Sequence, residues 1–393
     1  MSIQRIISSK LRLLFKFFIR FFFSYFTKGY RLHLIEPVFL GSILTLCILK
    51  LNKINNLILI FNPYDLFFKK KYINYLIFEE AYRKINNIRK ISFIRIIIWF
   101  LYFKSIIINK KNYFHQSIHL NEKFFSILSK NKEIIFDPVL TIEDKLIKKI
   151  LKKKFILFST RDSSYKKYTM KNRDSSYHSY RNESLFDYEN SLSRFHNKEM
   201  NIVRMGSIVE KKISNRKIID YSNLNCRNEN NDLLLVKNCF FYVGTGSGPD
   251  TLAINYQKPI VYVNWPHLPY LFTFKDNVVV IFKKIFDNDS KKFISFKQLL
   301  DKNFTKKAVP KIPVGVYFKT EQYRSSNLTV FSNSYKEIYY AVKEMKLYLE
   351  GKYIFNADYQ ENFRKLYYKS TGIKSSKKFF ISDYFYKKYF NLF

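Results

Sequence analysis

The feature that most constrains the fold is a glycine-rich loop between two short apolar runs. The first run, residues 240–243, is too short for a helix and consists of residues that favour strands. The loop Gly-Thr-Gly-Ser-Gly follows at residues 244–248, and the second run lies at residues 260–263. A proline after the loop suits the first turn of a helix, which we expect at residues 250–256. Strand, loop, helix and strand together predict a βαβ unit.

The loop lies where an anion would meet free backbone N–H groups and the positive end of a helix dipole. Ser247 or Gly248 is the expected N-cap of the helix. The loop does not match a dinucleotide fingerprint, because its third glycine comes one residue early and the second strand ends in Asn264 rather than in an acid. No Gly-Lys-Ser/Thr follows, which excludes a P-loop. Two interpretations are left, a phosphate or diphosphate cradle of another kind and a tight turn that binds nothing, and we favour the first.

Composition adds a strong positive charge. The chain has 393 residues, enough for two domains, and its 69 lysines and arginines against 31 acids give a net charge of +38. Such a charge favours an anionic partner, although the abundance of Ile, Lys, Asn, Phe and Tyr indicates that AT-rich codons contribute part of it. The three cysteines are far apart, so no disulfide framework or zinc site is expected, in keeping with a reducing cytoplasm.

The first thirty residues are aromatic and apolar but carry lysines and arginines throughout. Their longest uncharged run, residues 21–27, is too short to span a bilayer, and no signal-peptide cleavage site follows. We therefore expect residues 1–30 to form a basic amphipathic helix on an anionic membrane surface, which predicts a cytoplasmic protein held peripherally on the inner membrane. A helix packed on the protein's own surface is the alternative.

A first domain is expected at residues 31–151. Strand patterns at residues 32–35 and 57–61 flank a helix pattern at residues 42–51, which again predicts the start of an α/β layer. The second domain is expected at residues 152–350, and residues 351–393 form a basic aromatic tail without an assigned structure.

Polar residues follow the predicted strands of the second domain. The motif Arg-Asp-Ser-Ser-Tyr begins at Arg161, directly after a strand at residues 155–158, and recurs at residues 173–177. Another strand ends at Arg204. Because open α/β sheets bind ligands at the carboxyl ends of their strands, we expect these arginines and the glycine loop at one edge. Two guanidinium groups and oriented amides can hold a diphosphate without a metal.

Two patterns typical of metal sites are weaker. His115 and His119 are one helical turn apart, but no third ligand is evident. Asp287-Asn-Asp289 spells the D-x-D that holds a metal on a diphosphate, yet Asp and Asn also favour turns such as this lysine-rich one. We therefore expect no metal.

The motifs RDSSY, YHSYRN, VRMG, IIDY and FYVGTGSGPDTLA, followed by KPIVYVN, occur in that order over about residues 155–350. In this order they resemble a family of bacterial glycosyltransferases that is linked to surface-polysaccharide synthesis, and the glycine segment is similar, more distantly, to heptosyltransferases. The resemblance implies an α/β fold of two Rossmann-like domains facing across a cleft, the GT-B architecture. It also implies a nucleotide-sugar donor in the second domain and a glycan or lipid-linked acceptor bound mainly by the first.

This interpretation assigns roles to named residues. We expect His178 or Asp162 to be the base that deprotonates the acceptor, with Asp174 as a further candidate. No cofactor is expected besides the nucleotide-sugar substrate. The expected donor-binding residues are Arg161, Arg181, Arg204, Gly244, Thr245, Gly246, Ser247, Gly248 and Asp250.

Two other functions remain as alternatives. The chain could be a related α/β protein that binds a phosphorylated ligand without catalysis. It could instead bind nucleic acid through its charge, but the charge is spread along the chain and no motif of that class is present, so we expect no nucleic-acid partner.

Overall fold

The computed structural model describes residues 31–35, 42–51, 57–61, 75–84, 127–169, 176–301, 304 and 317–393, and the chain divides into two compact units, Met1–Ile118 and His119–Phe393. The boundary thus lies about thirty residues before the expected one. The expected amphipathic helix at residues 1–30 lies outside the described residues. None of the helices in the described part of the chain is long and apolar enough to cross a bilayer.

The first unit contains the predicted βαβ start. Strand β1 (Arg31–Ile35) pairs in parallel with β2 (Leu57–Phe61), and α2 (Ser42–Leu51) connects them in sequence. Helix α4 (Tyr75–Lys84) packs on α2, with Lys50 Nζ donating to the carbonyl of Lys84 at 2.6 Å. Buried apolar residues of both helices explain this packing, which follows from their 3.6-residue periodicity.

The second unit is built on a seven-stranded sheet of order β12-β8-β7-β6-β3-β4-β5 in which every pairing is parallel. Its strands are β3 (Lys154–Phe158), β4 (Met200–Arg204), β5 (Ile218–Asp220), β6 (Phe241–Gly244), β7 (Ile260–Trp265), β8 (Val278–Phe282) and β12 (Phe379–Ile381). Most of these strands are buried along their length, as expected for a parallel sheet that is covered on both faces. With β4 and β5 on one side of β3 and β6, β7 and β8 on the other, the order is Rossmann-like.

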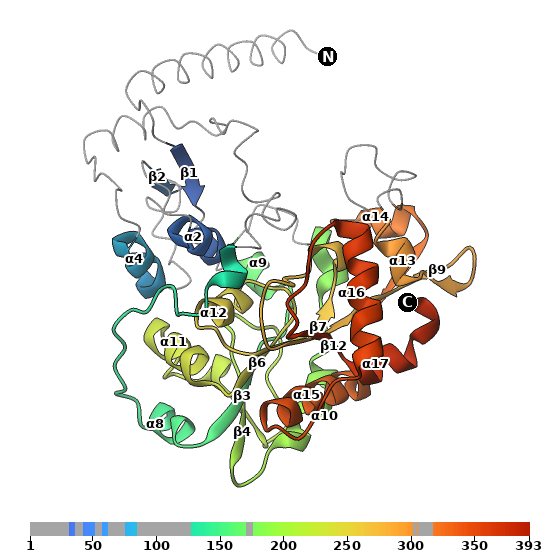
Figure 1. The fold of residues 1–393 in the computed structure, drawn as a ribbon. Helices are drawn as coiled ribbons and strands as arrows, with labels where there is room; N and C mark the ends of the chain where they lie inside the picture. Colours follow the sequence, from blue (N-terminus) through green and yellow to red (C-terminus); the bar gives the residue numbers. More distant parts are fainter. Residues whose placement is uncertain are drawn as a thin grey trace, which may run out of the picture. The chain divides into compact units, whose positions relative to one another are not determined.

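Helices cover the sheet in two groups. Helices α8, α11 and α12 pack together on one side of the strands, and α10 and α15 pack together on the other (Figure 1). The helices described in this unit are α8 (Lys145–Leu151), α9 (Ser164–Thr169), α10 (Leu185–Leu192), α11 (Glu229–Asn238), α12 (Asp250–Asn255), α13 (Phe296–Leu299), α14 (Thr320–Ser325), α15 (Tyr335–Leu349), α16 (Ala357–Thr371) and α17 (Asp383–Lys388), with 3-10 turns η3 (Ser176–Arg181), η4 (Ser193–Phe195), η5 (Tyr221–Asn223), η6 (Leu268–Tyr270) and η7 (Phe390–Leu392). A small antiparallel sheet joins β10 (Lys292–Phe293), β9 (Lys284–Asp287) and β11 (Leu328–Phe331).

The βαβ unit predicted around the glycine loop is confirmed by β6, α12 and β7. The expected N-cap is wrong. Pro249 takes that position, and its ring has no acceptor to cap the helix. The first helical residue, Asp250, instead turns its carboxylate back to accept the N–H of Ser247 at 2.8 Å.

Residues 351–393 are an integral part of the sheet rather than a separate tail. Strand β12 pairs with β8 in parallel and forms one edge of the sheet. Helix α16 packs on β12, and α17 packs on α15. The sequence of this region is basic and aromatic, and its aromatic rings pack into the core, as Phe363, Tyr367 and Phe385 show.

Candidate functional site

The sheet reverses its strand order at β3, whose neighbours are β4 and β6. Phe158, the last residue of β3, is in register with Arg204 on one side and Val243 on the other. The N–H of Ser159 continues the pairing by donating to the carbonyl of Val243 at 3.2 Å. The loops that follow β3 and β6 therefore emerge side by side at the carboxyl edge, which is where sheets of this type bind ligands.

The glycine loop at this edge is closed from within. Asp250 is fully buried, and its carboxylate accepts hydrogen bonds from the backbone N–H groups of Gly246 and Ser247. Burial raises the pKa of this carboxyl group to about 6. The amides that we expected to face a phosphate are thus satisfied by the chain's own anion, and Asp250 holds the loop rather than a donor.

Two glycines are explained by this arrangement. A Cβ on Gly244 would meet the Asp250 carboxylate and would lie 2.8 Å from Cε1 of Tyr242. Gly246 has a φ of +73°, in the left-handed region, and a Cβ there would lie 3.1 Å from the ring of Trp265. The loop's glycines therefore serve its close packing over Asp250 and Trp265.

Basic side chains gather beside the loop, and we call Arg161, Lys166, Arg181 and Lys283 the basic cluster. Arg181 donates from Nη2 to the carbonyl of Gly246 at 2.6 Å, which fixes its guanidinium on the glycine loop. Lys166 donates from Nζ to the Tyr177 hydroxyl at 3.2 Å and lies 4.4 Å from the centre of that ring. Lys283, which follows β8, donates to Ser332 Oγ at 3.0 Å. Arg161 and Lys283 thus follow the strands β3 and β8, and Arg181 is the last residue of η3.

Burial, and after it the neighbouring positive charges, lower the pKa values of Arg161, Lys166 and Lys283. Burial and then Arg181 lower the pKa of Arg161 to about 9. Burial, followed by the two arginines, lowers the pKa of Lys166 to about 7. Burial lowers the pKa of Lys283 to about 8, although the nearby Glu183 opposes this. Each shift favours loss of a proton, so positive charge is crowded at this site.

Carboxyl groups compensate the positive charge of the basic cluster only in part. Glu183 accepts at Oε2 from the backbone N–H of Arg161 and from the hydroxyl of Tyr188, both at 3.0 Å, and burial raises its pKa to about 7. In the described part of the chain, Nε of Arg161, Nε of Arg181 and Oε1 of Glu183 are buried without a hydrogen-bond partner. Buried polar atoms normally have partners, and an anion would supply one to the two arginine Nε donors, whereas Oε1 of Glu183 is an acceptor. Nε of Arg204, Arg227 and Arg364 also lacks a partner among the described residues, so the orphaned donors support an anion site only together with the convergence of cations here.

The two expected bases differ in their surroundings. His178 lies in η3 with its ring 4.0 Å from that of Tyr177, and its Nδ1 is buried without a hydrogen-bond partner among the described atoms. Burial, followed by Lys166, Arg181 and Arg161, lowers the pKa of His178 to about 3. The imidazole is therefore neutral at physiological pH but a weak base. Asp162 accepts backbone N–H groups on both oxygens, from Ser164 and Glu210 at 2.9 Å each, and so fixes the start of α9; Asp174 lies outside the described residues.

Arg204 ends β4 as expected but does not join the basic cluster. Its side chain is almost fully buried, with Nη1 donating to the carbonyl of Lys211 at 2.6 Å and Nη2 to Thr160 Oγ1 at 3.2 Å. Asp220, at the end of β5, lies 3.7 Å from Nη1. Arg204 therefore ties the strand ends together. Thr245 is buried in the loop, and the carbonyl of Gly248 accepts from Thr251 Oγ1 at 2.7 Å.

The D-x-D sequence forms a turn. Asp287 ends β9 and accepts the backbone N–H of Asp289 at 2.9 Å, within the exposed hairpin to β10. A search of the described residues finds no group of three His, Cys, Asp or Glu side chains placed to hold a metal ion. His115 and His119 lie outside the described part of the chain.

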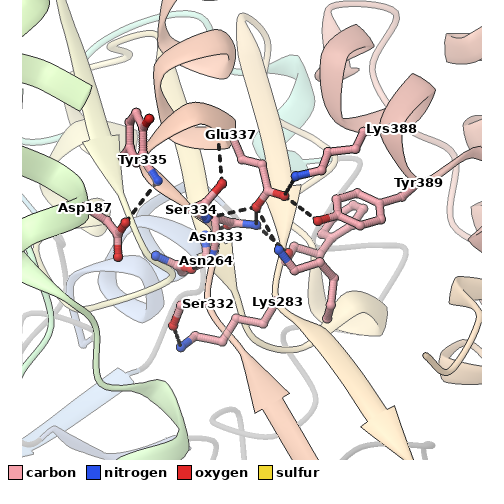
Figure 2. Close-up of polar contacts among 12 residues, drawn as sticks. Asp187, Asn264, Lys283, Ser332, Asn333, Ser334, Tyr335, Glu337, Lys388 and Tyr389 are labelled. Carbon is pink, nitrogen blue, oxygen red and sulfur yellow. Dashed lines mark hydrogen bonds and ion pairs between the residues drawn. The ribbon is translucent and has the colours of Figure 1, made fainter. Parts of the chain in front are cut away.

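A second polar network lies at the ends of β7 and β8, around Glu337 on α15 (Figure 2). Glu337 is buried, and its two carboxylate oxygens are each 2.7 Å from a lysine ammonium group, Lys284 on one side and Lys388 of α17 on the other. Although burial alone would raise it, the contact with Lys284 and the other donors lower the pKa of Glu337 to about 2. Asn333 links this network to β7, because its N–H donates to Asn264 Oδ1 at 2.6 Å.

This network adjoins the basic cluster through two neighbouring residues, Lys283 and Lys284. Lys284 is held toward Glu337, while the next residue along the chain, Lys283, extends to the carbonyl of Asn182 at 3.2 Å and to Ser332. The two neighbouring lysines thus serve different networks, and the C-terminal helix α17 contributes to holding one of them.

Sequence reasoning missed Lys166, Glu183 and Lys283. Lys283 directly follows the apolar run Val-Val-Val-Ile-Phe, which forms β8, so the argument that selected Arg161 also applies to it. Lys166 and Glu183 flank the two polar motifs, but lysine is so frequent in this chain that its position alone carries little information.

Comparison with protein families, with curated proteins and with solved structures gives no match for this chain.

Proposed function

We propose that the chain is a glycosyltransferase that uses a nucleoside-diphosphate sugar and places the diphosphate on the basic cluster. The observation that carries this proposal is the convergence of Arg161, Lys166, Arg181 and Lys283 near the point where the strand order reverses, with the Nε atoms of both arginines lacking partners among the described residues. Oriented cations at this position neutralise a diphosphate and stabilise the charge that develops as it leaves. No metal is needed for this step, since the side chains supply the charge.

The remaining parts of the proposal rest on the sequence resemblance. The first unit, which contains a βαβ element, would bind a glycan or lipid-linked acceptor across a cleft in a GT-B arrangement. The basic residues 1–30 would hold the protein peripherally on the inner membrane surface, in the cytoplasm. Sugar specificity would come from residues outside the basic cluster, because the cluster recognises only the phosphates that all such donors share.

Ligand binding is the direct test. Unfolding of the full chain would be followed with nucleoside diphosphates, nucleoside-diphosphate sugars and the uncharged nucleosides. A ligand at 100 times its dissociation constant stabilises by about 2.7 kcal/mol, enough for a shift of several degrees in Tm. Arg181→Met should abolish the shift, whereas Arg216→Met, at an exposed arginine, should leave it unchanged. Equal shifts with both variants, or a shift with nucleosides alone, would contradict a diphosphate site at the basic cluster.

One observation favours a second candidate, a protein that binds such a ligand without transferring the sugar. The carboxylate of Asp162 is engaged on both oxygens, and His178 is a weak base in the free protein. A carboxylate partner for the acceptor would then have to come from elsewhere. Tight diphosphate binding without any release of nucleoside diphosphate from its sugar, tested over a panel of acceptors, would favour this candidate.

A further inference from the structure

Helix α8 separates its apolar and basic residues completely. Ile147 and Ile150 are buried against the rest of the unit. The exposed residues are lysines at spacings i, i+3, i+4 and i+7, which place them on one stripe of the helix. We call this stripe the α8 lysine face: Lys145, Lys148, Lys149 and Lys152.

The α8 lysine face has no acidic partner in the described part of the chain, whereas some lysines on other helices do. On α15, Lys346 lies 2.7 Å from Glu350, and on α16, Lys365 lies 2.7 Å from Glu361. No ion pair within the described residues involves the α8 lysine face. The one acid at the start of the helix, Asp144, uses its carboxylate to accept the N–H groups of Leu146 and Ile147. Other helices also carry lysines without an ion pair in the described part of the chain, such as Lys336 on α15 and Lys369 on α16, so what distinguishes α8 is that its four lysines lie on one stripe.

Apolar side chains lie next to the charge. Val139, in the segment that leads to α8, is 92% exposed, and Ile142 is 46% exposed. Lys153 and Lys154 extend the basic surface beyond the helix and are also exposed. Cations beside exposed aliphatic side chains match the boundary between anionic headgroups and acyl chains. The phosphodiester backbone of a nucleic acid would need only the cations, so the exposed aliphatic side chains favour a lipid surface instead.

We propose that the α8 lysine face, with Val139 and Ile142, docks the protein on an anionic lipid bilayer. Helix α8 leads into the amino end of β3, whereas the basic cluster follows the carboxyl ends of β3 and β8. The docking surface and the basic cluster thus lie at opposite edges of the sheet, as the positions of α8 and of the strands in Figure 1 indicate. Docking leaves the carboxyl edge open to a ligand.

The test uses the full chain and two sets of vesicles, phosphatidylcholine alone and phosphatidylcholine with phosphatidylglycerol. Sedimentation should show binding to the anionic vesicles only, falling as salt rises. Replacing the four lysines of the α8 lysine face by Gln should reduce binding at least about tenfold, because each cation near an anionic surface contributes. The double variant Val139→Ser with Ile142→Ser should also weaken vesicle binding, but the dependence of that binding on salt concentration should be the same as in the wild type.

A matched control removes the same charge elsewhere, with Gln at the exposed lysines 291, 292, 377 and 378. An equal loss of vesicle binding in both quadruple variants would show that only net charge matters. Unchanged vesicle binding in the α8 variant would place the contact elsewhere. Either result overturns the proposal. A loss of duplex-DNA binding as large as the loss of vesicle binding would assign the surface to nucleic acid and would also overturn it. Nucleoside-diphosphate binding should be intact in the α8 variant, so this test and that of the proposed transferase can fail separately.

Discussion

Lys166 predicts how ligand binding depends on pH. Its ammonium group lies among Arg161, Arg181 and the ring of Tyr177, beside His178, and its pKa is lowered to about 7 by burial and then by the two arginines. A bound diphosphate adds negative charge to the cluster and raises that pKa. Above pH 7 the free protein therefore has to take up a proton when the ligand binds, so affinity must fall as pH rises.

The magnitude follows from linkage. If the diphosphate restores the ordinary Lys166 pKa of 10.5, the association constant falls roughly 50-fold between pH 7 and pH 9. Close to one proton is then taken up per ligand at pH 8. The last proton of a terminal phosphate leaves near pH 6, so the ligand contributes little to this change. Glu183 and Lys283, whose pKa values are about 7 and 8, shift in the same direction and add to the uptake.

The assay is titration calorimetry with a nucleoside diphosphate, in buffers of different ionisation enthalpy, from pH 6.5 to pH 9. Lys166→Arg keeps the charge but does not titrate, so its affinity should decline less with pH and exceed that of the wild type at pH 9. Lys167→Arg, at the exposed neighbouring lysine, should behave as the wild type. An affinity that is flat or rises from pH 7 to pH 9, or a Lys166→Arg variant with the wild-type profile, would refute the reasoning.

Three further predictions concern stability, the glycine loop and the membrane. Glu337→Gln should lower the free energy of unfolding in urea by about 3 kcal/mol, because Lys284 is left buried without its counter-charge. Since the pKa of Glu337 is depressed in the folded state, the wild type should lose this contribution as pH falls from about 4.5 toward 2. Equal urea midpoints of the variant and the wild type at pH 7 would contradict this prediction. Gly246→Val should lower diphosphate affinity in a folded protein. A valine is strained at a φ of +73° and its Cβ would meet the ring of Trp265, so the loop shifts and displaces the carbonyl to which Arg181 donates. Normal binding in calorimetry would show that the loop takes no part in the site. Deleting residues 1–28 should reduce sedimentation with anionic vesicles while nucleotide binding persists, and a truncated chain that binds vesicles undiminished would assign the attachment to other residues.

The fold was largely predictable where local chemistry decides it. The glycine loop, the proline after it and the apolar runs on both sides correctly predicted β6, α12 and β7, and the patterns before residue 62 predicted β1, α2 and β2. Strand β12 was missed, because it has only three residues and becomes a strand through pairing with β8, about a hundred residues earlier. Pairing over such a distance leaves no local signal.

The site was predicted less well than the fold, because it depends on where side chains point. Arg161 and Arg204 both follow strands at the same edge, yet only Arg161 joins the basic cluster, whereas Arg204 turns to Lys211 and Asp220. The inward turn of Asp250 depends on Tyr242 and the loop amides around it, which no spacing in the sequence reveals. The electrostatic interaction of Lys283 with Glu183, which lie about a hundred residues apart, requires the assembled sheet.

The position of β12 has a consequence for how the chain behaves before it is complete. Strand β8, with the sequence Val-Val-Val-Ile-Phe, has β7 on one side and β12 on the other. Until residue 381 has been synthesised, or in any fragment that stops short of it, one side of β8 presents unpaired N–H and C=O groups on an apolar strand. Such an edge is a template for pairing with another chain. The last strand of the sheet therefore protects the completed protein from aggregation, and nascent or shortened forms of the chain should depend on chaperones to remain dispersed.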